Sequence, residues 1–145
     1  MSVNRIETIK QIIVNKVQGL SHIRHTYNYE NANPQGFPFA TVTLDSFDGQ
    51  FADFSAISKR NIRNWNFLVR VYVERDEASF GSEKAERVAV ETADELLIAF
   101  DNDLTLGGEV KMVQVVSGSF TNEQIGNTVR VIEFVINCMD VVNAS

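Results

Sequence analysis

The chain has 145 residues, a formal net charge of −6 at pH 7 and a pI of about 4.9. Its 44% hydrophobic and 22% charged residues are typical of a globular domain and exclude a disordered chain. The acidic balance disfavours tight binding to nucleic-acid phosphates or anionic membranes, since both require clustered Lys and Arg. The length predicts one domain, residues 1–145, which on folding buries about 68–70% of the surface of the unfolded chain.

The only cysteine, Cys138, has no second cysteine with which to form an intramolecular disulfide. The first residues lack the apolar segment of a signal peptide, and no apolar run reaches the length of a membrane span. We therefore expect a protein of the cytosol, or one that is assembled there, with no membrane partner.

The first third of the chain predicts a helix followed by strands. A helix is expected over residues 3–20, because apolar residues recur there every three or four positions: Ile6, Ile9, Ile13, Val17 and Leu20. A strand is predicted over 22–29, and the turn residues of 31–36 separate it from the next strand. That next strand is predicted over 39–45, where Ala40, Val42 and Leu44 alternate with threonines.

Residues 46–60 fit neither the helical nor the strand period. Asp48-Gly49 predicts a hairpin turn, whereas Phe47, Phe51, Phe54 and Ile57 give the segment an apolar content that is high for a surface loop. We interpret 46–60 as a long loop or a projecting hairpin.

The clearest pattern follows at 61–75, where alternation predicts a strand with one buried face, consisting of Trp65, Phe67, Val69, Val71 and Val73. A second amphipathic helix is predicted over 82–100. The Leu104-Thr-Leu-Gly-Gly108 turn leads to strands at 110–116 and 128–141, with 122–127 as a polar connecting loop. The fold class that follows is α+β: a two-layer domain in which two helices pack on a mostly antiparallel sheet of four to five strands.

No residue pattern predicts catalysis, a cofactor or a metal site. His22 and His25, three positions apart on a strand, point to opposite faces, which is poor geometry for a shared metal. Asp101 and Asp103 with the glycine pair that follows fail the calcium-loop template, so a helix-ending turn is favoured. Cys138 lies in an apolar strand and is interpreted as a buried, inert thiol. We expect that the protein is not an enzyme and binds no cofactor.

Basic residues gather on one segment of this acidic chain: Lys59, Arg60, Arg63 and Arg70. Two interpretations remain open, a charged strand that discourages edge pairing and a contact for an acidic neighbour. The apolar residues beside them favour an interface. The candidate interface residues, for contacts with another subunit or with a tube, are Phe51, Phe54, Ile57, Lys59, Arg60 and Arg63.

The layout resembles the tail terminator, or tail completion, proteins of long-tailed bacteriophages. The resemblance covers most of the chain and is carried by its N-terminal helix, Gly36-Phe-Pro-Phe-Ala40, the aromatic strand Trp65–Tyr72, the helix 85–100 and the Leu-Gly-Gly turn. It implies a virion structural protein, assembled in the host cytoplasm and located in the tail. Such proteins form a hexameric ring that caps the tail tube, stops its polymerisation and joins the tail to the head connector.

The resemblance also implies partners: further copies of the chain, the tail tube protein and head–tail connector proteins. DNA would pass through the lumen without specific binding. A ring needs two different complementary patches on each copy, and a projecting 46–60 segment is a candidate for one of them.

Two other functions stay open on the sequence. Another neck protein, such as a head–tail connector or stopper, is also small and ring-forming. A small-molecule-binding α+β domain, with helices closing a pocket over the sheet, predicts instead a monomer or dimer with a ligand-dependent melting temperature.

Overall fold

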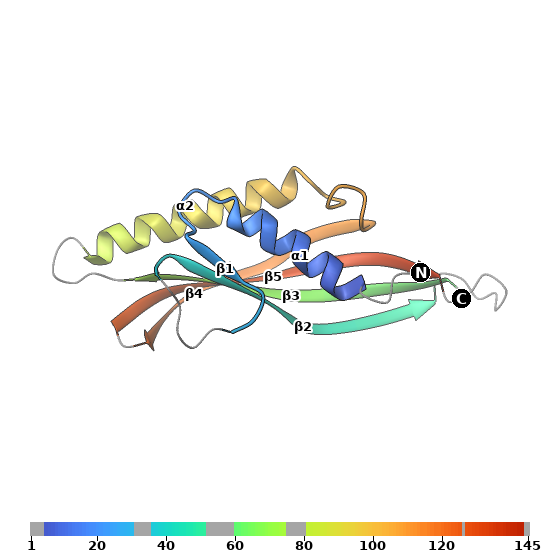
Figure 1. Ribbon diagram of the computed structural model, residues 1–145, viewed down its shortest axis with the longest axis horizontal. Helices are drawn as coiled ribbons and strands as arrows, with labels where there is room; N and C mark the ends of the chain where they lie inside the picture. Colours follow the sequence, from blue (N-terminus) through green and yellow to red (C-terminus); the bar gives the residue numbers. More distant parts are fainter. Residues whose placement is uncertain (1–4, 31–35, 52–59, 75–80, 126, 144–145) are drawn as a thin grey trace.

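The computed structural model describes residues 5–30, 36–51, 60–74, 81–125 and 127–143. Two helices lie on one face of a twisted five-stranded sheet whose long strands run along the molecule (Figure 1). This confirms the predicted two-layer α+β fold. The elements in chain order are α1 (Arg5–Gln18), β1 (His25–Tyr27), β2 (Phe39–Phe51), β3 (Arg60–Glu74), α2 (Gly81–Asp101), β4 (Met112–Ile125) and β5 (Asn127–Asn143).

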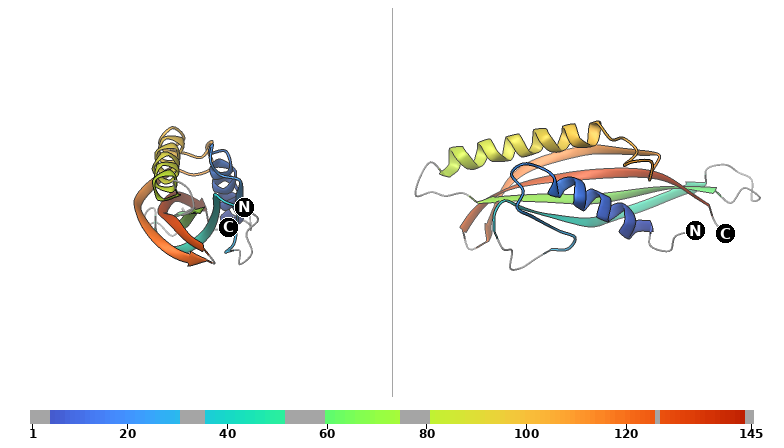
Figure 2. Two further views of the ribbon diagram at one scale, coloured as in Figure 1. Left: turned by 90° about the vertical axis from the view of Figure 1, so that its left-hand side faces the viewer. Right: turned by 45° about the horizontal axis from the view of Figure 1, so that its top comes forward.

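The strand order is β1-β2-β3-β5-β4. Only the short β1 runs parallel to its neighbour; the other three pairs are antiparallel. Helix α1 contacts β1 and β2, whereas α2 crosses β3, β5 and β4, so that the helices lie side by side on one face (Figure 2). The strand expected over 22–29 is confined to His25–Tyr27.

The main core fills the space between the helices and the sheet. The predicted face of β3 is buried as expected, with Phe67, Val69 and Val71 fully covered. Side chains that face it include Ile9 and Ile13 from α1, and Leu96 and Phe100 from α2. Burial of these apolar surfaces stabilises the fold by roughly 25 cal/mol per Å².

A second, smaller core lies on the opposite face of the sheet, near one end. Phe39 stacks on Tyr72 with ring centroids 4.5 Å apart and planes 9° apart. Val129 and Val131 complete this cluster, and Tyr27 and Phe37 pack against it. Burial raises the pKa of the Tyr72 phenol. The alternation of β3 predicted only one buried face, and this cluster covers part of the other.

Strand β2 continues past the expected end at residue 45, to Phe51, and pairs with β3 throughout. The predicted turn at Asp48-Gly49 is wrong, because these residues lie within the strand, opposite Asn64 and Arg63. A bulge between Leu44 and Ser46 shifts the alternation by one residue. Apolar side chains therefore change from even to odd positions, which explains why the segment fitted no single period.

Strand β4 is also longer than the predicted 110–116 strand. It begins at Met112, is interrupted by a bulge between Val115 and Ser117, and continues to Ile125. Residues 122–125 and 127, expected in a polar loop, pair in the β4–β5 hairpin instead. Polar residues are tolerated there because β4 is an edge strand of the described sheet.

The segment between α2 and β4 is a tight turn with three successive left-handed residues. Leu106, Gly107 and Gly108 have φ angles of 49°, 69° and 90°. Glycine adopts such angles without steric cost, which explains the Gly-Gly pair. The Asp103 carboxylate accepts the N–H of Gly107 at 2.9 Å, and this hydrogen bond, followed by that from Lys16, lowers the pKa of Asp103. The helix-ending turn predicted from the sequence is thus what forms.

Candidate interaction surface

Three of the six predicted interface residues lie at one end of the sheet. Phe51 ends β2 and pairs in register with Asn61, next to Arg60, the first residue of β3. Arg63 is half-buried and stands opposite Gly49, where any Cβ would collide with its guanidinium. The other three predicted residues, Phe54, Ile57 and Lys59, lie outside the described residues. Strand pairing therefore brings Phe51, Arg60 and Arg63 to the same end.

An exposed aromatic residue near this end was not among the predicted interface residues. Phe47 is 64% exposed and lies against Trp65, with ring centroids 5.8 Å apart. The indole of Trp65 is buried, so Phe47 extends the core out to the surface. After the β2 bulge the apolar positions change from even to odd numbers, so that Phe47 lies opposite Trp65. This change of alternation was the feature of the sequence that could have identified Phe47.

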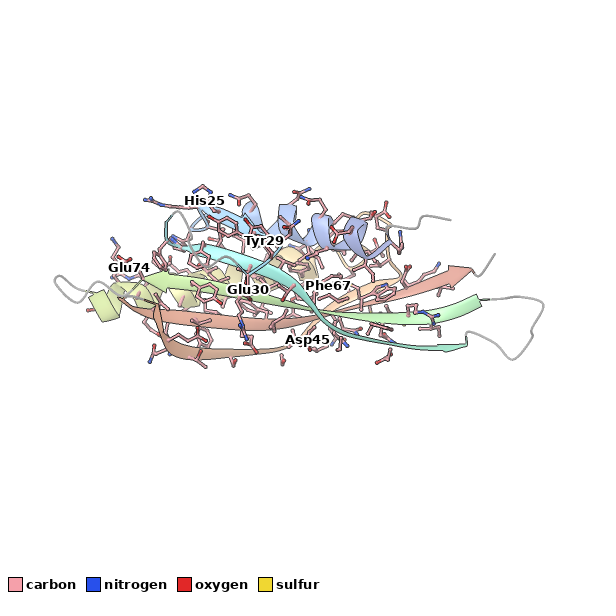
Figure 3. All side chains as sticks on the ribbon, turned by 60° about the horizontal axis from the view of Figure 1, so that its bottom comes forward. His25, Tyr29, Glu30, Asp45, Phe67 and Glu74 are labelled. Atoms are coloured by element: carbon pink, nitrogen blue, oxygen red, sulfur yellow. The ribbon has the colours of Figure 1, made fainter. Side chains whose placement is uncertain are left out.

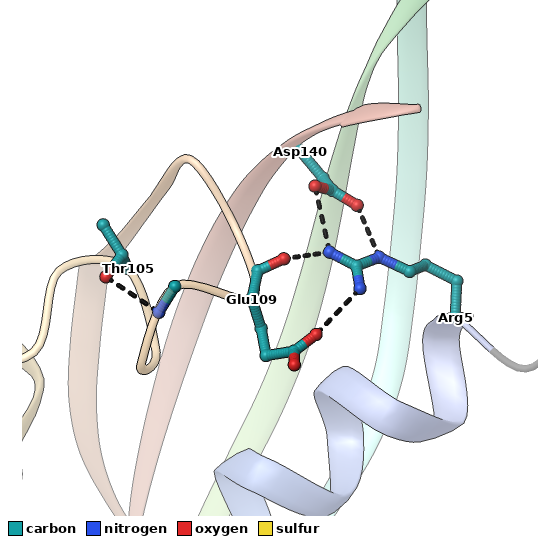
Figure 4. A network of polar contacts seen from close by, with 5 residues as sticks. Arg5, Thr105, Glu109 and Asp140 are labelled. Atoms are coloured by element: carbon teal, nitrogen blue, oxygen red, sulfur yellow. Dashed lines mark hydrogen bonds and ion pairs between the residues drawn. The ribbon is translucent and has the colours of Figure 1, made fainter. Parts of the chain in front are cut away.

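A network centred on Arg5 fastens α1 to the same end of the sheet (Figure 4). The guanidinium donates two hydrogen bonds to the buried Asp140 of β5, at 2.8 and 3.1 Å. It also contacts Glu109, through the carboxylate at 3.0 Å and through the main-chain oxygen. The hydrogen bonds to Asp140 are the largest cause that raises the pKa of Arg5. A bidentate Arg–carboxylate pair fixes direction as well as distance, so it sets the position of α1.

The structure changes the interpretation of the arginines in the basic segment. Strand β3 lies in the middle of the sheet, so its arginines do not protect an edge. Arg70 pairs with Glu133 of β5 at 3.0 Å and with Glu30 at 3.7 Å. Glu30 lies beside β2 on the face that the helices leave uncovered (Figure 3). Arg70 is thus neutralised within the molecule and is not available as a free contact for an acidic partner.

The sheet face away from the helices carries mainly neutral polar side chains in its middle. Asn66 donates to Ser46 at 3.1 Å and accepts from Asn137 at 2.9 Å, so a hydrogen-bonded row crosses three strands. In register with this row lies Gln114 of β4. Serines and threonines of β2 and β4 continue the same surface: Thr43, Ser117, Ser119 and Thr121. The described residues place no cluster of cations on this face that could hold phosphates.

Two long strand edges have no partner among the described residues. Strand β4 pairs only with β5, and beyond Thr41 strand β2 pairs only with β3. Three apolar residues of β4 are exposed, with 49% of Met112, 51% of Val116 and 41% of Phe120 accessible. The two edges lie on opposite sides of the molecule, as a surface for head-to-tail association requires.

The two histidines considered as metal ligands have different surroundings. His22 forms a contact of 2.8 Å with Glu91 of α2, and His25 lies on β1. The structure holds, over its described ranges, no group of three His, Cys, Asp or Glu side chains suited to a metal ion. Neither of the helices it describes is long and apolar enough to cross a bilayer.

Cys138 is fully buried, and its desolvation raises the pKa of the thiol to about 12. At pH 8 the thiol is therefore protonated, and the thiolate is the reactive form. We expect native protein to react with a maleimide at least 100-fold more slowly than protein unfolded in guanidinium, as followed by mass spectrometry. Equal rates in the two states would contradict the buried position.

The sequence matches no protein-family profile and no curated protein sequence. Among solved structures, the fold is similar to that of the sheath/tube terminator, in its extended state, of PVC, an extracellular contractile injection system. The two chains superpose with a TM-score of 0.50 at 10% identity, over 99% of this chain and 58% of the other. A second solved structure, 18% identical over 95% of this chain and 96% of its own, gives a TM-score of 0.48. This chain thus spans about 58% of the length of the injection-system terminator, and the likeness shows a shared fold.

Proposed function

We propose that this protein is a terminator subunit of a tail-like structure: a non-enzymatic protein that forms a ring on the end of a tube and stops its growth. The observation that carries the proposal is the fold, which matches a sheath/tube terminator over 99% of the chain. The bacteriophage tail terminators that the sequence resembles supply the finer expectation. It comprises a homo-hexamer that contacts tail tube protein on one side and a head–tail connector on the other, in a virion tail.

The surface of the molecule supports a ring with an open lumen. The middle of the uncovered sheet face is mainly polar and neutral, an apolar cluster around Phe39 and Tyr72 lies near one end of it, and Arg70 is paired with acidic residues of the same chain. With a net charge of −6, a lumen lined by this face lets DNA pass without retaining it. No cofactor or metal is needed for such a role, which depends on surface complementarity alone.

The proposal is tested by light scattering over a concentration series, with and without tube protein, followed by negative-stain imaging. We expect six-fold rings, alone or on tube ends, and shorter tubes when the protein is present during polymerisation. A strict monomer or dimer that leaves tube length unchanged would refute the terminator role. Rings that bind portal or adaptor protein but not tube protein would instead identify a connector or stopper.

The candidate interface at the end of β2 gives a specific prediction. Replacing Phe51 and Phe54 together with serine should weaken assembly at least tenfold, because loss of an aromatic side chain that acts as an interface hot spot costs about 2 kcal/mol or more. We expect the fold to persist, which the melting temperature of the double variant checks. The matched control is Val90→Ser on the outer side of α2, a residue that is 50% exposed. Sedimentation velocity compares the variants, and normal assembly of the double variant would remove these residues from the interface.

A further inference from the structure

The open edge of β4 lacks most of the features by which proteins prevent edge pairing. The strand has 14 residues, and only one of them, Glu123, is charged. It has no proline, and it exposes apolar side chains at Met112, Val116 and Phe120. One bulge, at Val116, is its single irregularity. At its start the edge is occupied, because the Val113 N–H donates to the main-chain oxygen of Leu104 at 2.7 Å. Beyond Val113 the described residues place no strand along this edge, and a long edge of this composition presents N–H and C=O groups that can bind another strand.

The outer edge of β2 has the same opening on the other side of the sheet. Strand β1 covers it only from Phe39 to Thr41. From Val42 onwards, the described residues leave the outer side of β2 without a strand. Asp45, at the bulge, and Asp48 are exposed along this edge, and Figure 3 shows where Asp45 lies.

We propose that the outer edge of β4 pairs, antiparallel, with the outer edge of β2 in the next copy of the chain. This inference rests on the ring proposed above and names the contact that would build it. Along the order β2-β3-β5-β4 each strand runs opposite to the one before, so β4 runs opposite to β2. Copies related by rotation about an axis along the strands keep this alternation, and their sheets join into one antiparallel sheet.

The two edges also match in side chains. Gln114 on β4 and Ser46 on β2 occupy one transverse row of the sheet, connected through Asn137 and Asn66. Joining β4 to the next β2 therefore continues the neutral polar face from copy to copy. The charges agree as well. Lys111, the residue immediately before β4, is exposed and forms no ion pair among the described residues, whereas the β2 edge carries Asp45 and Asp48.

A second copy joined through β2 is favoured over a twofold pairing of β4 with β4. Twofold pairing gives a closed dimer and leaves the β2 edge of each copy unpaired. When two different edges pair, any open row of subunits keeps one unpaired edge at each end. Only a closed ring pairs the β2 and β4 edges of every copy.

Cross-linking between engineered cysteines tests the contact. Gln114→Cys and Ser46→Cys are combined in one chain, assembled under the conditions that give rings, and treated with a short bismaleimide. Wild-type protein is the background control, because its only thiol, Cys138, is buried. Each single variant and the pair Asp94→Cys/Ser46→Cys, which places one thiol on the exposed side of α2, are the matched controls.

We expect the double variant to give a ladder of cross-linked species that ends at the size of the ring, whereas the single variants and the α2 pair give none. Dimers from Gln114→Cys alone would show twofold β4 pairing and overturn the inference. Rings on tube ends without cross-links in the double variant would also overturn it, yet leave the proposed function standing. Cross-linked rings that do not bind tube protein would support the strand pairing and refute the terminator function.

A charged edge gives an independent readout with no engineered thiol. Gln114→Glu places a carboxylate on the exposed side of β4, in the row of Ser46 and near the aspartates Asp45 and Asp48 of the proposed partner edge, so like charges oppose pairing. We expect at least tenfold weaker self-association at low salt with an unchanged melting temperature. Normal association of this variant would contradict the pairing.

Discussion

Replacement of Arg5 by alanine should destabilise the protein by about 2–4 kcal/mol. Breaking a buried ion pair from one side commonly costs about 3–5 kcal/mol, because the remaining charge stays buried without a partner. Asp140 is that remaining charge, with only 6% of its side chain exposed. The lower end of the range applies here because 28% of the Arg5 side chain is exposed and water screens part of the interaction.

Urea unfolding measures this effect, and three variants define its origin. Arg5→Lys keeps the charge but loses the bidentate geometry, so it should lie between wild type and alanine. The double change Arg5→Met/Asp140→Leu removes both charges and should recover most of the loss. Gln11→Ala, an exposed position on the same helix, should change stability by less than about 0.5 kcal/mol. A loss below about 1 kcal/mol for Arg5→Ala would show that the network does not hold α1.

Replacement of Phe67 by alanine should cost about 3–5 kcal/mol, the range for a large aromatic removed from a packed core. Phe67 is fully buried in the central strand β3 and belongs to the cluster that both helices cover. The substitution leaves a cavity in the core. The surroundings cannot collapse fully into it, because β2 and β5 pair with β3 on either side and hold its backbone in place. A loss of this size is a large fraction of the roughly 5–15 kcal/mol by which domains are stable.

Phe47→Ala is the matched control for Phe67→Ala. Phe47 is also a phenylalanine of the β2–β3 pair, but it is 64% exposed, so its loss should cost less than about 1 kcal/mol. Thermal and urea unfolding of both variants test the contrast. Equal losses would contradict the assignment of Phe67 to the core and of Phe47 to the surface. Weaker assembly of Phe47→Ala without loss of stability would add Phe47 to the interface.

The parts of the fold that were predicted correctly are those with an uninterrupted period. The alternation from Trp65 to Val73 gave strand β3 and its buried face, and helical spacing gave α1 and α2 to within two residues. The Leu-Gly-Gly turn was also predicted, because positive φ angles select glycine strongly.

Errors arose where a bulge or a contact distant in sequence decided the structure. The bulges in β2 and β4 each shift the alternation of apolar and polar residues by one position. Both strands were therefore predicted to end near the bulge. The ion pair between Arg5 and Asp140 joins residues 135 positions apart, and nothing local to either residue indicates the other. Of the six predicted interface residues, Phe51, Arg60 and Arg63 share one end of the sheet; Phe54, Ile57 and Lys59 lie outside the described residues.

Residue type and spacing along the chain were enough to predict most of the helices and strands and their apolar faces, because these features are local. The strand order, and with it which edges stay open and which charges are neutralised, became known only from the folded chain. Arg70 is an example. In the sequence it belongs to a basic segment, whereas in the fold its guanidinium donates a hydrogen bond to Glu133 of the neighbouring strand β5. Strand order is set by packing between distant segments, and local spacing carries no information about it.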